Sequence, residues 1–200
     1  MDITFAKYDT ANRVPGVWAE FDASNANNAT ERLRSLIIGQ GQTGKVTAAL
    51  ASVPQIVSYQ ADVAATYGAR SQLALMVAEY RQIDPTGELW ILPLADPTGG
   101  AVASGTVAFA GTATAAGSIG LYVGGVRVEV PVSVGDTAAV IATNAAADVN
   151  AVVAPVVASA ATGTLTLTAT GPGVWGNDSP IALNYGGTLA GEAMPAGITA

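Results

Sequence analysis

A glycine-rich heptapeptide, GQGQTGK at Gly39–Lys45, has the residue types and spacing of a phosphate-binding loop. It follows an apolar segment, as that motif requires, and Leu89–Asp96 is similar to the apolar strand that ends in a magnesium-binding carboxylate. Val46, however, stands where a Ser or Thr hydroxyl would bind the metal. Pro54 also interrupts the segment that should form the phosphate-binding helix. A P-loop-like nucleotide-binding protein is therefore an alternative, and the structure we predict here is a loop after a strand.

Cysteine and histidine are both missing from the sequence. The first absence excludes disulfides, a thiol nucleophile and thiolate metal sites. The second removes the commonest general base and the commonest zinc ligand, so this chain alone cannot form a serine–histidine triad. We therefore predict that the protein is not an enzyme and that it has no catalytic residue, no cofactor and no metal site.

A tight turn at Trp175-Gly176-Asn177-Asp178 carries an aromatic side chain that could form a sugar-binding platform. The competing interpretation is a turn anchored in the core by Trp175. The first interpretation leaves a second alternative open, in which the protein is a receptor-binding or sugar-binding module.

Charged residues make up only 12% of the chain, about half the usual share, which favours a subunit whose surface is largely covered by partners. The net charge of −7 is uneven, because the second half carries a single basic residue, Arg127, among several acidic ones. Nucleic acid is excluded as a partner, since phosphates require Lys and Arg.

Neither terminal nor internal segments have the pattern of a membrane or export signal. The start, MDITFAKYDT, has no basic and no apolar region of a signal peptide. The Ala/Val-rich run at 138–161 is interrupted by polar residues and a proline, so we expect no membrane insertion. We expect the protein to be made and kept in the cytoplasm, or to be released by lysis.

Residues 30–95 have an α/β pattern. We predict strands at Leu33–Ile38 and Gln55–Val57, a helix capped by Ser58, and a second helix capped by Ser71 with an apolar face of Leu73, Met76, Val77 and Tyr80. The apolar run Glu88–Ala95 predicts a strand buried on both faces. Three strands make a thin sheet, which indicates that the sheet is incomplete.

Residues 105–185 have the pattern of a separate, β-rich α+β domain. Alternating residues on both sides of Gly124-Gly125 predict a hairpin. Asp136 is expected to cap a helix that buries Ile141, Ala145 and Val149. The strand Thr164–Thr170 would bury Leu165, Leu167 and Ala169 and expose its threonines, and Ile181, Leu183 and Tyr185 predict another strand. Residues 96–104 and 186–200 have the composition of linkers.

The N-terminal segment contains a short alternating strand, Val17–Phe21, followed by an asparagine-rich loop. One interpretation is an edge strand of this chain's own sheet. The other is an arm that adds a strand to a neighbouring subunit.

The residues resemble one known family, the tail sheath proteins of contractile-tailed phages of the Mu-like type. The segments that carry the resemblance are RVPGVWAEFDASNAN, LRSLIIGQ, VSYQADVAATYGARSQLALMVAEYRQIDP and ELWILPLAD in the first half, and GTVAFAGTATAAGSIGLYVGGVRVEVPVSVGDTAAVIA, TGTLTLTATGPGVWGNDSPIALNY and AMPAGIT in the second. The resemblance spans essentially the whole chain but only the N-terminal part of the family's length, so we expect a fragment of a longer protein.

The resemblance implies a fold of α+β and α/β class: an incomplete α/β sheath core at 22–95, an N-terminal arm at 1–21 and an inserted β-rich outer domain at 105–185. It implies a structural subunit that polymerises around the tail tube and contracts to drive it through the host envelope during genome delivery. The implied arm contacts are Ile3, Phe5, Val17, Trp18 and Phe21, and the implied hinge residues are Asp22, Asn25, Asn27 and Asn28. The implied partners are other copies of the chain in a helical homo-oligomer, the tail tube protein, and baseplate and tail terminator proteins. The implied location is the virion, assembled in the bacterial host cytoplasm.

Overall fold

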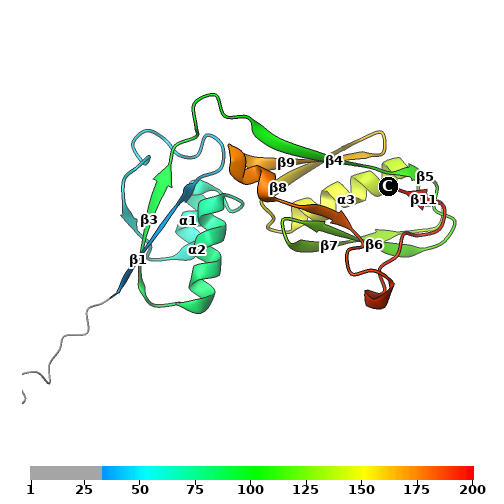
Figure 1. Ribbon diagram of the computed structural model, residues 1–200, viewed down its shortest axis with the longest axis horizontal. Helices are drawn as coiled ribbons and strands as arrows, with labels where there is room; N and C mark the ends of the chain where they lie inside the picture. The colour runs from blue at the N-terminus through cyan, green and yellow to red at the C-terminus, as the bar shows by residue number, and fades with distance from the viewer. Residues whose placement is uncertain (1–32) are drawn as a thin grey trace, which may run out of the picture. The chain divides into compact units, whose positions relative to one another are not determined.

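The structure is a computed structural model that describes residues 33–200 and combines helices with several small sheets (Figure 1). Two hydrophobic clusters form and share no residue, one within residues 37–91 and one within 107–198. We call residues 33–95 the α/β part and residues 102–200 the β-rich part. The predicted mixture of helices and strands is confirmed.

In chain order the elements are β1 Arg34–Gln40, β2 Gln55–Ile56, α1 Gln60–Tyr67, α2 Gln72–Ile83, β3 Glu88–Leu94, β4 Val102–Ala108, β5 Ala110–Gly111, β6 Gly117–Val123, β7 Val126–Val132, α3 Ala138–Ala151, β8 Val156–Ala161, β9 Thr164–Pro172, η1 Val174–Asp178, β10 Ile181–Leu183, η2 Thr188–Ala190 and β11 Ile198–Thr199.

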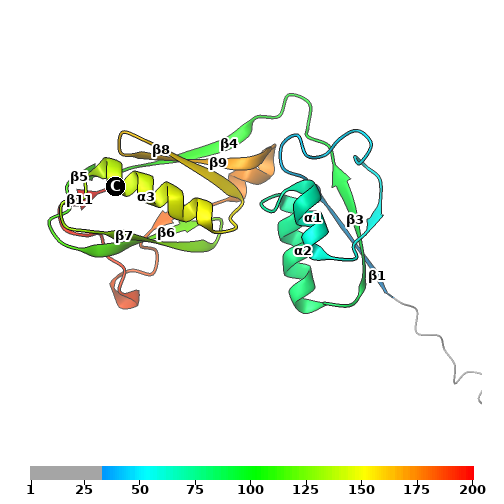
Figure 2. The same ribbon diagram turned by 180° about the vertical axis from the view of Figure 1, so that it is seen from behind.

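The α/β part is built on a three-stranded sheet of order β1-β3-β2, in which β1 is parallel and β2 antiparallel to β3. One face of this sheet places Ile37, Leu89 and Ile91 in a cluster with residues of α1 and α2. Figure 2 shows the two helices side by side next to the strands of this sheet. The prediction that Glu88–Ala95 is buried on both faces is wrong, because exposure alternates along β3. Both helices pack on the same face, and no other element among residues 33–200 covers the opposite one.

The two helices of the α/β part differ in how they begin. Ser71 caps α2 as predicted, since its Oγ accepts a hydrogen bond from the Ala74 N–H at 3.1 Å. The predicted Ser58 cap is wrong, because α1 begins after Tyr59 and has no side-chain cap. Met76, predicted on the buried face of α2, is 40% exposed, so the buried stripe of that helix is narrower than its periodicity indicated.

The hairpin of β6 and β7 is confirmed. Gly124 and Gly125 have φ values of +56° and +84°, the left-handed conformations that a type I′ turn requires and that glycine adopts without strain. The inward side chains of the hairpin, among them Ile119, Leu121 and Val130, are fully buried.

Helix α3 packs against β7, β8 and β9 (Figure 1) and buries Ile141, Ala145 and Val149 completely, as predicted. The predicted Asp136 cap is wrong. The N-cap residue is Thr137, and the Asp136 carboxylate instead accepts a hydrogen bond from the Ser133 N–H at 2.7 Å, within the turn that precedes the helix.

A second sheet of the β-rich part has the order β4-β9-β8, with the predicted burial of Leu165, Leu167 and Ala169. Strand β8 lies in an Ala/Val-rich run with no predicted strand, and β4 begins inside the predicted linker, at Val102. Thr170, predicted on the exposed face of β9, is only 4% exposed.

Residues 186–200 are not the flexible linker that their composition indicated. Ile198 is 5% exposed and belongs to the core of the β-rich part, and β11 pairs with β5. Glu192 is buried as well. Tyr185, by contrast, lies beyond the end of β10 and is 80% exposed.

Candidate functional site

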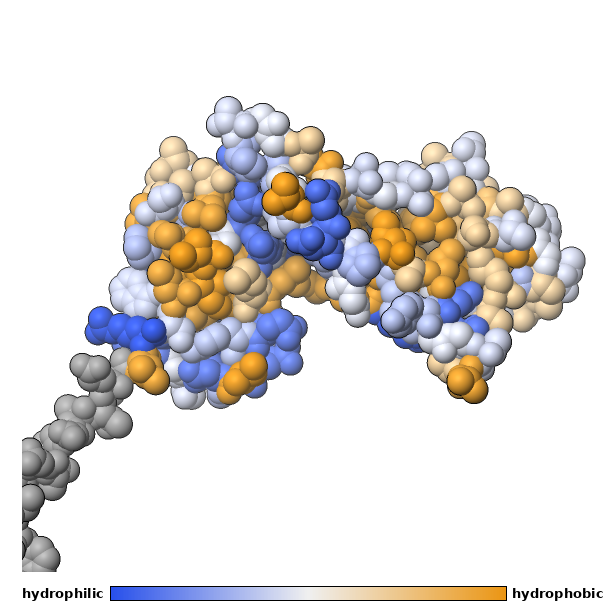
Figure 3. All heavy atoms as spheres, in the orientation of Figure 1, coloured by the Kyte–Doolittle hydropathy of each residue, from blue (hydrophilic) through white to orange (hydrophobic). Residues whose placement is uncertain are grey.

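The uncovered face of the β1-β3-β2 sheet is an apolar surface. The strand register aligns Leu36, Trp90 and Ile56 in one row across the three strands, and Ile38 pairs with Leu92 in the next row. Leu36 is 53% exposed, Ile56 57% and Ile38 48%. Figure 3 shows apolar side chains gathered over this sheet. We call these five residues the open sheet face.

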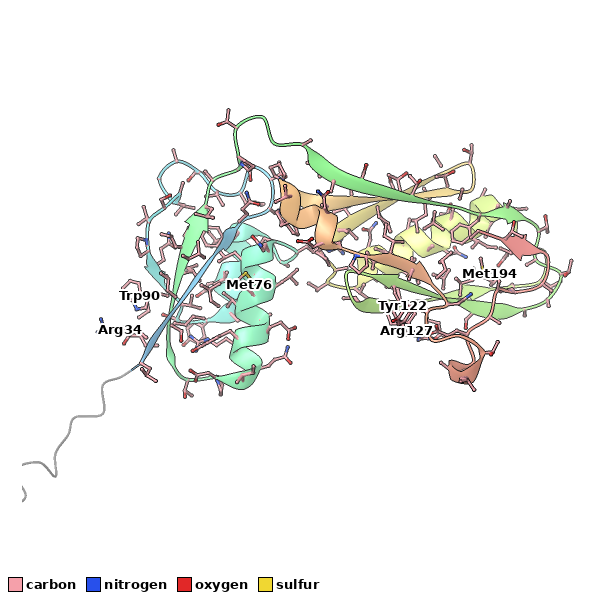
Figure 4. The ribbon with its side chains drawn as sticks, viewed as in Figure 1. Arg34, Met76, Trp90, Tyr122, Arg127 and Met194 are labelled. Atoms are coloured by element: carbon pink, nitrogen blue, oxygen red, sulfur yellow. The ribbon has the colours of Figure 1, made fainter. Side chains whose placement is uncertain are left out.

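A shallow apolar groove of about 260 Å³ crosses one end of the open sheet face and is lined by Arg34, Ser35, Leu36, Pro54 and Trp90. The Trp90 indole N–H donates to Glu88 Oε1 at 2.9 Å, and Arg34 Nε forms an ion pair with the same oxygen at 3.0 Å. Figure 4 labels Arg34 and Trp90 at this end of the sheet. Because Glu88 binds both neighbours, the indole ring is held in place beside the groove.

Strand β1 is an edge strand, since within residues 33–200 only β3 pairs with it. An edge strand presents backbone N–H and C=O groups that can pair with a further strand. The open sheet face and the outer edge of β1 adjoin each other, so together they suit an extended, apolar polypeptide segment better than a small polar ligand.

The glycine-rich loop after β1 does not form a phosphate-binding site. The backbone N–H groups of Gln42, Thr43 and Lys45 donate to Tyr67 O, Thr170 O and Gln42 O at 2.8, 2.9 and 2.8 Å, and the Gly44 N–H donates to Asp96 Oδ2 at 3.2 Å. The donors that would bind phosphate are thus already used, and a carboxylate lies where an anion would bind. The residues after Lys45 form turns rather than a helix, so the helix N-terminus of the motif is missing as well. The nucleotide-binding alternative is not supported.

Trp175 does not form an open aromatic platform. The side chain is half-buried on η1, and a Cβ added to Gly171 would lie 3.2 Å from its Cζ2 atom, so the ring packs closely against β9. This packing agrees with the anchored turn rather than with the sugar-binding alternative.

A buried carboxylate in the β-rich part was missed at the sequence level. Glu192, 5% exposed, accepts hydrogen bonds from Arg127 Nε and Tyr122 Oη, both at 2.7 Å, and from the Gly186 N–H at 2.8 Å. Figure 4 labels Tyr122 and Arg127, which face each other across β6 and β7. A Cβ at Gly120 would approach Glu192 Oε1 to 2.7 Å, so this glycine makes room for the carboxylate. The available signal was that Arg127 is the single basic residue of the second half.

The hydrogen bonds from Arg127 and then from Tyr122 lower the pKa of Glu192. The stabilisation that Glu192 provides is therefore complete above the pKa of an unfolded glutamate, about 4.3, and is lost as the pH falls through the lower native pKa. Tyr122 shows the reciprocal effect, since its hydrogen bond to Glu192 raises the pKa of the phenol.

We expect Glu192→Gln to lower the melting temperature at pH 7 by about 5 °C or more, because Arg127 loses its buried partner charge. Thermal unfolding followed by circular dichroism from pH 7 to pH 3 measures this change, and the difference from wild type should shrink below about pH 4. Glu129→Gln is the matched control, since Glu129 is 58% exposed and only 3.4 Å from Arg127. Equal losses in both variants would contradict a special role for Glu192.

The predicted arm residues Ile3, Phe5, Val17, Trp18 and Phe21 and the predicted hinge residues Asp22, Asn25, Asn27 and Asn28 lie outside the described residues. Within the described part, no three His, Cys, Asp or Glu side chains come together as a metal would need, and no helix is long and apolar enough to cross a membrane.

Within residues 33–200, the fold thus combines an unpaired strand edge with an apolar sheet face. The chain is 36% identical over 204 residues to the Mu-like prophage FluMu tail sheath protein of Haemophilus influenzae (strain ATCC 51907 / DSM 11121 / KW20 / Rd). That similarity covers 100% of this chain and 41% of the relative, so the chain spans less than half the length of that protein. No protein-family profile matches the chain. The resemblance to Mu-like tail sheath proteins is thus confirmed along the whole sequence.

Proposed function

We propose that the chain is part of a structural subunit of a contractile phage tail sheath. The observation that carries the proposal is the 36% identity, which extends through both the α/β part and the β-rich part to a protein named as a tail sheath. In this proposal the subunit polymerises around the tail tube and contracts to drive the tube through the host envelope. It acts through contacts between subunits and needs no catalytic residue. Its location is the virion tail, assembled in the host cytoplasm.

The open sheet face supports this proposal from the physical side. In a layered α/β fold, helices or further polypeptide cover both faces of a sheet that contains parallel strands. Here the second face exposes Leu36, Ile38 and Ile56. The relative has more than half of its length beyond the region that matches. Polypeptide corresponding to that remainder is the occupant we propose for the open sheet face and for the edge of β1.

The domain organisation in this proposal follows the expected one, except that the outer domain also includes residues 102–104 and 186–200. Residues 1–21 act as the arm that adds a strand to a neighbouring subunit, with Val17, Trp18 and Phe21 as the main contacts. Residues 22–95 contribute to the core that faces the tube, and the β-rich part, residues 102–200, forms the outer domain. The asparagine-rich loop from Asp22 is the hinge that lets linked subunits move. The other copies, the tube protein, and the baseplate and terminator proteins are the partners.

Deletion of residues 1–21 tests the proposal. The complete open reading frame that contains these 200 residues should form tubes or rings, visible by negative-stain electron microscopy. The deletion should leave a folded protein that does not assemble, because the strand that links subunits is removed. Normal tubes from the truncated protein would refute the arm assignment. Absence of any assembly from the complete reading frame, with tube protein present, would refute the sheath function itself.

A further inference from the structure

Arg70 lies in the short connection between α1 and α2 of the α/β part, yet its side chain binds the β-rich part. The guanidinium donates to the backbone oxygens of Asn150, Val152 and Val156, the last two at 3.0 and 3.4 Å, and to Asn150 Oδ1 at 3.2 Å. Two of these residues lie at and just beyond the C-terminal end of α3. Among residues 33–200, the acceptors that the Arg70 guanidinium binds are all backbone carbonyl or side-chain amide oxygens.

Arg70 is placed to stabilise the C-terminal end of α3. The last carbonyl groups of an α-helix have no partner within the helix, and they carry the negative end of its dipole. Helix α3 has no basic residue in its last turn. Arg70 therefore supplies from the α/β part the cation and the donors that α3 lacks.

Thr170 forms the second half of the same contact. Its Oγ1 donates to Arg70 O at 2.7 Å, and its backbone oxygen accepts from the Thr43 N–H at 2.9 Å and from Thr43 Oγ1 at 3.1 Å. These bonds explain why the Thr170 side chain is buried instead of exposed with the other threonines of β9. Each part thus donates hydrogen bonds to the other: Arg70 and Thr43 donate to the β-rich part, and Thr170 donates to the α/β part.

We infer that Arg70, Thr170 and Thr43 form a hydrogen-bonded clasp that holds the α/β part and the β-rich part together and that can open without unfolding either. The two hydrophobic clusters share no residue, so opening this clasp breaks polar bonds but exposes neither cluster. Water can replace the broken hydrogen bonds, which makes such an opening much less costly than unfolding a core. The inference goes beyond the proposed function, because it concerns a conformational change of the isolated chain.

Amide hydrogen exchange of the full 200-residue chain, followed by NMR, tests the inference. The Thr43 N–H is protected by Thr170 O, so its exchange reports the opening directly. Arg70→Met should accelerate Thr43 exchange at least about tenfold, a change of about 1.4 kcal/mol in the opening equilibrium. The amides of Val57 and Phe109, which donate to Leu89 O and Gly163 O within each part, should keep their wild-type rates. Thr170→Val should act in the same direction.

Arg81→Met is the matched control. Arg81 also donates to three backbone oxygens, those of Asp84, Gly87 and Val57, but all of them lie within the α/β part. This variant should leave Thr43 exchange unchanged. Unchanged Thr43 exchange in Arg70→Met would overturn the clasp. Faster exchange of Phe109 together with Thr43 would also overturn it, since Arg70 would then stabilise the fold of the β-rich part itself.

Discussion

Under the proposed sheath function, Ile38→Glu is expected to abolish assembly of the complete reading frame while leaving residues 33–200 folded. Ile38 is 48% exposed on the open sheet face, where it pairs with Leu92. A half-exposed residue loses little burial when replaced, so we expect the free energy of unfolding of the 200-residue chain to fall by about 1 kcal/mol or less. Covering the same face with apolar polypeptide would bury the new charge without a partner, at a cost of several kcal/mol.

Two measurements on the complete reading frame check this prediction. Urea denaturation gives the stability of the folded part, and negative-stain electron microscopy scores tubes and rings. Val140→Glu is the matched control, because Val140 is 43% exposed on α3, away from the open sheet face. Tubes in the control but not in Ile38→Glu would support the role of the face. Tubes in both variants would show that the open sheet face stays exposed in the assembly.

Gly111→Ala should strongly destabilise the β-rich part, by about 3 kcal/mol or more, because backbone strain and a steric clash occur together. Gly111 has a φ of +92°, and a Cβ there would lie 2.2 Å from the Gly197 carbonyl oxygen. The clash would separate β5 from β11 and withdraw Ile198 from the core.

Gly125→Ala separates the contribution of backbone strain from that of the steric clash in Gly111→Ala. Gly125 has a similar φ of +84°, but no atom lies within 4 Å of an added Cβ. This control should cost about 1–2 kcal/mol from backbone strain alone. Urea denaturation at pH 7 measures both variants. Equal losses would mean that residues 197–198 do not pack against Gly111 in solution.

Local patterns were sufficient for the elements in which one face is buried and the other exposed. Alternating residues predicted the two strands β6 and β7. The Gly124-Gly125 pair between them predicted the turn, because a type I′ turn requires residues in the left-handed conformation. The buried stripe of α3, formed by Ile141, Ala145 and Val149, was predicted because the helical period places these residues on one side. Strand β8 was missed because Ala and Val are compatible with several structures, and pairing with β9 decides between them.

The functional surfaces were harder to predict. The apolar run of β3 indicated burial on both faces, but whether helices cover one face or two depends on where α1 and α2 pack. The composition of residues 186–200 indicated a linker, because neither the pairing of β11 with β5 nor the ion pair between Glu192 and Arg127 leaves a local signal. These two groups are 65 residues apart in the sequence.

The sequence by itself determined the chemistry that is excluded and the resemblance to tail sheath proteins. Both follow from residue identity, since a chain without histidine and cysteine lacks their chemistry in any conformation, and similarity to a relative is a property of residue order. The tertiary structure alone showed which groups occupy the backbone donors of the glycine-rich loop, that β1 is an edge strand beside an apolar face within residues 33–200, and that Arg70 of the α/β part hydrogen-bonds to the β-rich part. Each of these depends on which groups pair or pack across long sequence separations, and no local pattern specifies those contacts.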